Sequence, residues 1–143
     1  MSVRMYRLLI VASFMALGIS ILIEPAATRA LPAELRIYLR ETAEPLAGMG
    51  DVLKIVVAAA YLAVVISSAV GLYRLRSWAR PLAVTITLLT FVLMPLLGPR
   101  VESGWTATLL EAEWLLWGMV LALSYWSPVA EHFVNPRGAG PAA

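Results

Sequence analysis

The sequence contains no cysteine, and it has one histidine among its 143 residues. Without cysteine the chain forms no disulfide, no thiolate metal site and no cysteine nucleophile, and its redox compartment is left open. The histidine, His132, follows the last apolar run, so the sequence offers no histidine cluster for a metal. Glycine-rich phosphate loops, zinc-protease helices and nucleophile elbows are also absent from it. We therefore expect no enzymatic activity, no metal site and no bound cofactor.

Charged residues are scarce as well, and long hydrophobic runs make up much of the chain. Charged residues make up 14% of the chain and hydrophobic residues 61%, compared with ~25% and about 45 to 50% in soluble domains. Four apolar runs cover approximately residues 8–23, 52–73, 81–97 and 107–126. Each run is close to the ~20 residues that a helix needs to cross a ~30 Å hydrocarbon core. The sequence therefore predicts an all-α integral membrane protein whose four transmembrane helices form an antiparallel bundle.

No segment between these runs is long enough to fold as an independent domain. Residues 1–134 are therefore expected to form one transmembrane domain, and residues 135–143, rich in glycine and proline, a flexible tail. Residues 32–44 alternate apolar and charged positions at helical spacing, with Pro32 suited to a first turn and Pro45 to an end. This pattern predicts a short amphipathic interfacial helix between the first and second spans. Its opposite charges can neutralise one another on a solvated face, or the segment can form a lid or a partner surface.

The placement of the basic residues predicts the orientation in the membrane. Arg4 and Arg7 precede the first run, and Arg74, Arg76 and Arg80 lie between the second and third. By the positive-inside rule, the N terminus, the central loop and the C-terminal tail are expected in the cytoplasm. Other basic residues fall on the opposite side, so an inverted orientation stays open. The three central arginines are also candidates for binding anionic lipid headgroups.

The first run also has the basic start and apolar centre of a signal peptide. Arg29 and Pro32 surround a poor cleavage site, so we expect the run to be retained as a signal anchor. Further along, residues 71–81, GLYRLRSWARP, resemble a loop of small bacterial inner-membrane proteins with paired spans. That resemblance implies a bacterial inner (cell) membrane location, and it implies no activity.

Small residues at helical spacing mark the faces where membrane helices pack closely. The residues expected to pack are Ala12, Ala16 and Ser20 in the first run, Ser67 and Gly71 in the second, and Gly118 and Ala122 in the fourth. We expect these faces to meet inside one bundle. The alternatives are an interface between subunits and the lining of a narrow path. The tryptophans are expected mostly to mark the ends of the spans.

Three acidic residues form a speculative proton or cation site at the outer end of the bundle. Glu111 and Glu113 lie about one turn inside the fourth span if its helix begins near residue 106, and a carboxylate at that depth is costly unless it is paired or hydrated. Their separation of ~200° around the helix allows only one to face inward. We expect Glu111 to do so, because it shares a face with Gly118, and Glu113 to be exposed. Glu24 ends the first run at a comparable depth, and the alternative for all three is a structural role at helix ends.

These features lead to one functional hypothesis and two alternatives. We expect a small non-enzymatic membrane protein that assembles with itself or serves as an accessory subunit. Its partners would be the lipid bilayer and membrane helices, and no sequence feature indicates nucleic acid. The second hypothesis is a small homo-oligomeric channel or transporter with Glu111 and Glu24 at its outer mouth. The third, an enzyme acting on lipid-linked substrates, would need a catalytic base or metal that the sequence does not provide.

Overall fold

The computed structural model describes residues 2–29, 32–35, 37, 50–94 and 102–134. The helices whose bounds lie within these residues are α1 (Val3–Arg29), α3 (Asp51–Tyr73), α4 (Ala79–Leu93), α5 (Gly104–Trp126) and α6 (Val129–Val134). The described part of the chain contains no strand, so the all-helical prediction is confirmed. Within the described residues, three segments are long and apolar enough to cross a membrane: Val3–Ala26, Asp51–Tyr73 and Gly104–Trp126. With 15 residues, α4 is shorter, and four spans stay a prediction.

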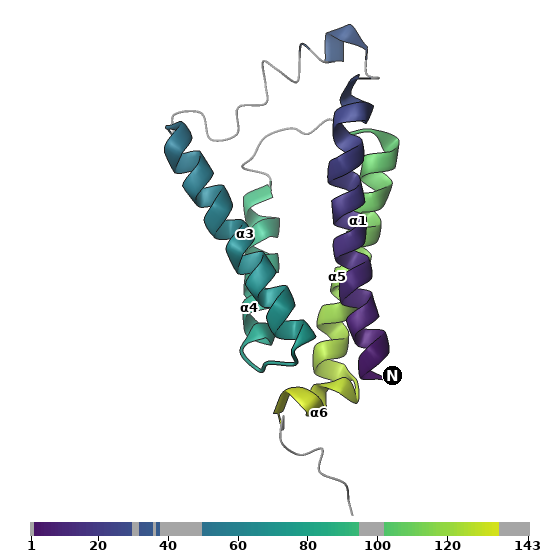
Figure 1. Cartoon of the computed structure of the whole chain (residues 1–143), viewed down its shortest axis with the longest axis vertical. Coiled ribbons are helices and arrows are strands. Elements are labelled where there is room, and N and C mark those ends of the chain that lie inside the picture. The colour runs from purple at the N-terminus through teal and green to yellow at the C-terminus, as the bar shows by residue number, and fades with distance from the viewer. Residues whose placement is uncertain (1, 30–31, 36, 38–49, 95–101, 135–143) are drawn as a thin grey trace, which may run out of the picture.

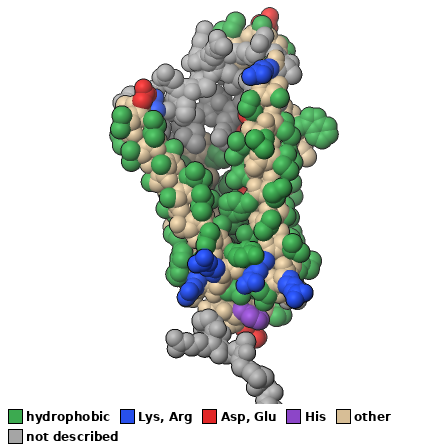
Figure 2. All heavy atoms as spheres, viewed as in Figure 1, with side chains coloured by type: hydrophobic (Ala, Val, Ile, Leu, Met, Phe, Trp, Pro, Cys, Tyr) green, Lys and Arg blue, Asp and Glu red, His purple; other side chains and the backbone are tan. Residues whose placement is uncertain are grey.

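The helices are arranged in two pairs (Figure 1). Helix α1 lies along α5, and α3 lies along α4, with the two members of each pair running in opposite directions. The pairs are close at one end of the molecule, where the N terminus, the α3–α4 turn and α6 lie, and they diverge toward the other end. We call the first of these the arginine end, because basic side chains gather there (Figure 2): Arg4 and Arg7 lie near the start of α1, and Arg74 and Arg76 lie in the α3–α4 turn.

A seven-residue repeat explains how α1 packs on α5. On α1 the buried side chains include Tyr6, Ser13 and Ser20, and on α5 they include Thr106 and Val120. Residues seven apart lie on nearly the same side of a helix and form a row of side chains along it. Two such rows interlock when the axes of the two helices are nearly aligned. The seam is rich in hydroxyl side chains, which allow the two backbones to approach closely inside an apolar environment.

The turn between α3 and α4 ends α3 with a Schellman motif. The Arg76 N–H donates to the Gly71 carbonyl at 2.8 Å, and the Leu75 N–H donates to the Leu72 carbonyl at 3.0 Å. Leu75 occupies the left-handed position with φ 55°, where glycine is usual. Gly71 permits close approach of the next helix, since a Cβ placed on it would lie 2.5 Å from the Cβ of Ala79. The loop between the second and third runs is therefore a specific, tightly packed turn.

Local capping moves the start of α5 away from the expected position. The Ser103 side chain accepts a hydrogen bond from the Thr106 N–H at 3.1 Å, and the helix begins at Gly104 rather than near residue 107. Of the predicted interfacial helix at 32–44, residues 33–35 and 37 are helical, and the remainder beyond 37 lies outside the described residues. The predicted tail at 135–143 and the expected end of the third span at residues 95–97 also lie outside them.

Candidate functional site

The structure reverses the expected orientation of the two glutamates on α5. Glu113 is half-buried and faces α1, where the Ser13 hydroxyl donates a hydrogen bond to its Oε1 at 3.4 Å. Glu111 is exposed on the other side of the helix. The expectation that Glu111 faces inward was wrong because the packing face follows the seven-residue row through Thr106 and Val120, to which Glu113 belongs. Gly118, used to assign the face, is itself exposed.

Glu113 also lies deeper than one turn from the boundary. Exposed tryptophans stand near both ends of α5, Trp105 at 77% and Trp126 at 86% relative exposure, as amphipathic rings do at membrane surfaces. Glu113 follows Trp105 by eight residues, which corresponds to a rise of about 12 Å, against a half-thickness of about 15 Å for the hydrocarbon core. Its partner Ser13 is near the centre of the apolar segment Val3–Ala26. Both helices therefore place this contact close to the middle of the span.

Polar side chains also link the other helices near the depth of Glu113. One turn along α5 from Glu113, Trp117 donates from its Nε1 to the Thr87 hydroxyl of α4 at 2.9 Å. The ring of Phe14 meets Trp117 edge-on, with centroids 6.0 Å apart. Between α3 and α4, the hydroxyls of Tyr61 and Thr90 are 2.9 Å apart. Polar side chains thus join neighbouring helices both at a part-buried position, as with Trp117 and Thr87, and at an exposed one, as with Tyr61 and Thr90.

Arg80 has a structural environment that sequence reasoning did not anticipate. Its guanidinium lies over the Tyr125 ring, 4.3 Å from the centroid, and 5.1 Å from the centroid of Phe133. Phe133 in turn packs edge-on against the fully buried Tyr6, with ring centroids 6.0 Å apart. Arg80 therefore holds α4 against α5 and α6 through cation–π contacts.

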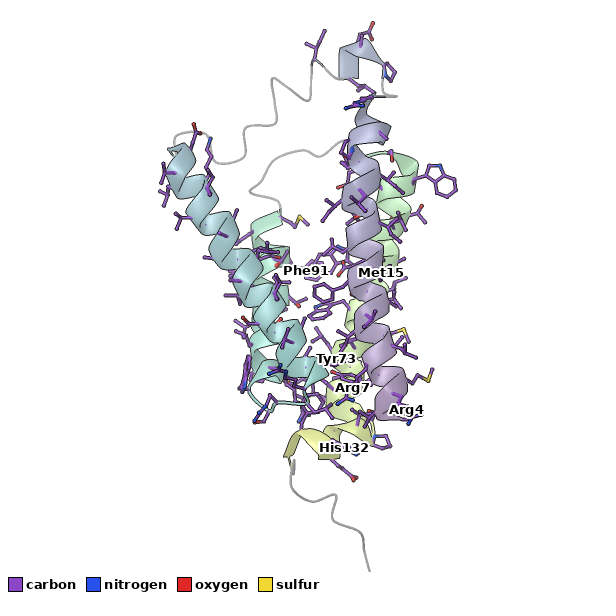
Figure 3. The ribbon with its side chains drawn as sticks, in the orientation of Figure 1. Arg4, Arg7, Met15, Tyr73, Phe91 and His132 are labelled. Carbon is purple, nitrogen blue, oxygen red and sulfur yellow. The ribbon has the colours of Figure 1, made fainter. Side chains whose placement is uncertain are left out.

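Arg7 makes the corresponding link between α1 and α3. Its Nε donates to the Tyr73 carbonyl at 3.1 Å, and its guanidinium lies 5.0 Å from the centre of the Tyr73 ring. Figure 3 shows Arg7 next to Tyr73 at the same end as Arg4 and His132. A cation at the last carbonyls of α3 is also favoured by the helix dipole. Unlike Arg7 and Arg80, Arg74 and Arg76 are exposed, as headgroup contacts require.

The small residues expected to pack inside one bundle divide into two groups. Ser20 and Gly71 are buried within the chain, as expected. Ala12, Ser67 and Gly118 are exposed, and Ala16 and Ala122 are partly exposed. A Cβ placed on Gly118 would have no atom within 4 Å. The stripe on α5 is therefore directed away from the described helices, because α1 packs on the opposite side.

The proposed outer-mouth glutamates lie on different helices and differ in exposure. Glu24 is partly buried on α1, whereas Glu111 lies on the exposed side of α5. Sequence reasoning missed Ser13 as a partner, although the seven-residue spacing of Ser13 and Ser20 on one helix and of Thr106 and Glu113 on another was a usable signal. Among the described residues, no group of three or more His, Asp or Glu side chains could hold a metal ion. No family model, curated protein or solved structure matches this chain.

Proposed function

We propose that the chain is a small, non-enzymatic, multi-pass membrane protein that acts as a self-assembling or accessory subunit of a membrane complex. In this proposal four helices cross a bacterial inner membrane in an antiparallel bundle, with an interfacial helix after the first. The N and C termini are cytoplasmic. The proposal rests on the face of α5 that no described helix covers.

Support for the orientation comes from the arginine end. Figure 2 shows basic side chains gathered there, and Arg74 and Arg76 are exposed. Basic residues flanking spans are retained on the cytoplasmic side. Support for a fourth span comes from α4, because the apolar run that forms it continues beyond Leu93 to Leu97. A run of that length approaches what a tilted or locally thinned bilayer requires.

The observation that carries the proposal is an uncovered carboxyl beside an uncovered glycine. Glu111 is exposed six residues after Trp105, which corresponds to a depth of about 9 Å along the helix. On the same face, Leu115 is 72% exposed and Gly118 has open space around it. A carboxyl facing lipid at this depth is costly, and glycine allows another helix to come close. Both features are explained if a helix of another subunit covers this face.

The first test is the mass of the intact complex after gentle extraction into lipid nanodiscs, measured by native mass spectrometry. A defined homo-oligomer supports self-assembly. Stoichiometric co-purification of other polypeptides supports an accessory role, and their identity then defines the complex. A lone 143-residue chain, unchanged across extraction conditions, contradicts the proposal.

The face itself is tested by Gly118→Leu, with Gly18→Leu as the matched control. A Cβ on either glycine meets no atom within 4 Å, so the first atom of each new side chain has room within the chain. We expect Gly118→Leu to dissociate the complex, because a bulky side chain prevents close approach of the partner helix. Gly18→Leu should leave the complex mass unchanged. Equal behaviour of the two variants would exclude this face as the interface.

A second function, a homo-oligomeric channel or transporter, is favoured by the same exposed position of Glu111. If several copies meet at this face, their Glu111 carboxyls surround the contact zone, where they could bind cations. Glu24, the other member of this hypothesis, lies near the end of α1 and is partly buried. Cation flux into proteoliposomes, compared between the unchanged protein and Glu111→Gln, separates a path from a scaffold, since a scaffold carries no flux.

A further inference from the structure

The hydrogen bond between Ser13 and Glu113 lies on the side of α5 that faces α1, opposite the exposed face proposed for assembly. It joins α1 to α5 near the middle of both apolar segments. Ser13 is 1% exposed, so its hydroxyl is shielded by neighbouring side chains. Glu113 is half-buried, and its Oε1 accepts the hydrogen bond from Ser13 at 3.4 Å. A titratable group is thus held at a defined place inside the seam.

The helices around Glu113 bring no countercharge to it. Along these helices, the titratable or charged side chains nearest to its level are Tyr6, Arg7 and Glu24 on α1, Arg80 on α4 and Glu111 on α5. Arg7 is engaged by Tyr73, and Arg80 lies against aromatic rings at the arginine end. Glu111 points to the other side of its helix. Within the described residues no Lys or Arg forms a salt bridge with Glu113.

A single hydroxyl donor is a weak substitute for the hydration of a carboxylate. Ionisable groups inside a membrane therefore carry a proton, pair with an opposite charge or face a water-filled space, and they mark proton and ion pathways. Pairing is not provided here. The two remaining states of Glu113 are a neutral acid packed in the seam and a carboxylate that water reaches. Exchange between these states is uptake and release of a proton.

We propose that Glu113 is a proton-binding site in the interior of the membrane, with the Ser13 hydroxyl as its positioning partner. The bond that forms or breaks is the O–H bond of the carboxyl group, and water is the proton donor or acceptor. Because Glu113 belongs to the row that packs α1 on α5, its charge state acts directly on that contact.

Infrared difference spectroscopy of the full chain in lipid nanodiscs tests this directly. Spectra between acidic and alkaline buffer report the C=O stretching band of each carboxyl group that loses its proton. We expect Glu113→Gln to remove one band component from a desolvated carboxyl and Glu111→Gln to leave that component unchanged. Glutamine keeps the size and hydrogen-bonding capacity of the side chain, and circular dichroism of each variant verifies that the helices are retained.

Ser13→Ala supplies a second readout that does not depend on removing the glutamate. Loss of the hydrogen bond from Ser13 should shift the Glu113 component to higher wavenumber and leave other carboxyl bands in place. The proposal is overturned if Glu113→Gln and Glu111→Gln give the same spectra, or if Ser13→Ala moves nothing. It is also overturned if the component responds to Na⁺ or K⁺ concentration at constant pH, since Glu113 would then be a cation site.

Discussion

Gly71 is the position at which the structure makes its sharpest stability prediction. A Cβ on Gly71 would lie 2.5 Å from the Cβ of Ala79 and 2.9 Å and 3.1 Å from two ring atoms of Trp78. Two of these separations are shorter than Cβ atoms adopt in proteins, and the first neighbour is a short side chain that cannot turn away. Gly71→Ala therefore forces the backbones of α3 and α4 apart at the turn that joins them.

The loss of stability caused by the steric clash in Gly71→Ala can be separated from the gain in helix propensity that alanine brings. Overpacking of a tight site costs about 1 to 3 kcal/mol. Replacing glycine by alanine inside a helix returns up to about 1 kcal/mol. Gly18→Ala, on α1, gains the same propensity without a contact, because a Cβ there has no atom within 4 Å. We therefore expect Gly71→Ala to be less stable than Gly18→Ala by about 1 to 3 kcal/mol.

Reversible unfolding in mixed detergent micelles, followed by circular dichroism, measures this difference. Ala79→Gly introduced into Gly71→Ala should recover part of the loss, because it removes the methyl group that the new Cβ meets. The reasoning is refuted if the two glycine variants differ by less than about 0.5 kcal/mol, the usual error of such comparisons. It is also refuted if Ala79→Gly destabilises the protein equally with and without the Gly71 substitution.

Two further predictions concern contacts between helix pairs and use the same unfolding measurement. Trp117→Phe removes the hydrogen bond to Thr87 and should lower the free energy of unfolding by about 0.6 to 1.5 kcal/mol. Thr87→Val should then lower it little further in the Trp117→Phe background. Fully additive effects in this double-mutant cycle would contradict a stabilising hydrogen bond. Arg80→Lys should lower the free energy of unfolding by about 0.5 to 2 kcal/mol, because lysine cannot lie flat over the Tyr125 ring. The control, Arg74→Lys, changes an exposed arginine and should be nearly neutral. Equal losses of stability at both positions would show that the aromatic contact contributes nothing.

The existence of the long helices follows from local sequence. Three of the apolar runs form helices long enough to cross a membrane, and a helix satisfies its backbone hydrogen bonds within its own segment, so this outcome does not depend on neighbours. Their ends were less predictable. Helix α5 begins at Gly104 because Ser103 caps it, and α1 extends back to Val3, well before the apolar run begins. Caps and polar first turns lie outside the hydrophobic signal that defines a run.

The direction of each helix face was decided by tertiary packing. On α5, the small residues Gly118 and Ala122 suggested one inward face, but apolar residues surround the whole helix and lipid is a suitable environment for nearly all of them. The face that packs is the one whose row of side chains interlocks with α1. For this reason Glu113, and not Glu111, meets Ser13.

The roles of the arginines divide in the same way. The positive-inside rule uses only the number and position of basic residues along the chain, so the sequence alone is enough for the orientation that we propose. Whether an arginine meets a headgroup or an aromatic ring depends on which helix lies beside it. Arg80 meets Tyr125 at the end of α5 and Phe133 of α6 because these segments lie beside the start of α4, although they are far from Arg80 in the sequence. The sequence by itself determined an all-helical membrane protein, whereas only the tertiary structure decided which of its few polar groups meet, because those meetings depend on helix register and not on local composition.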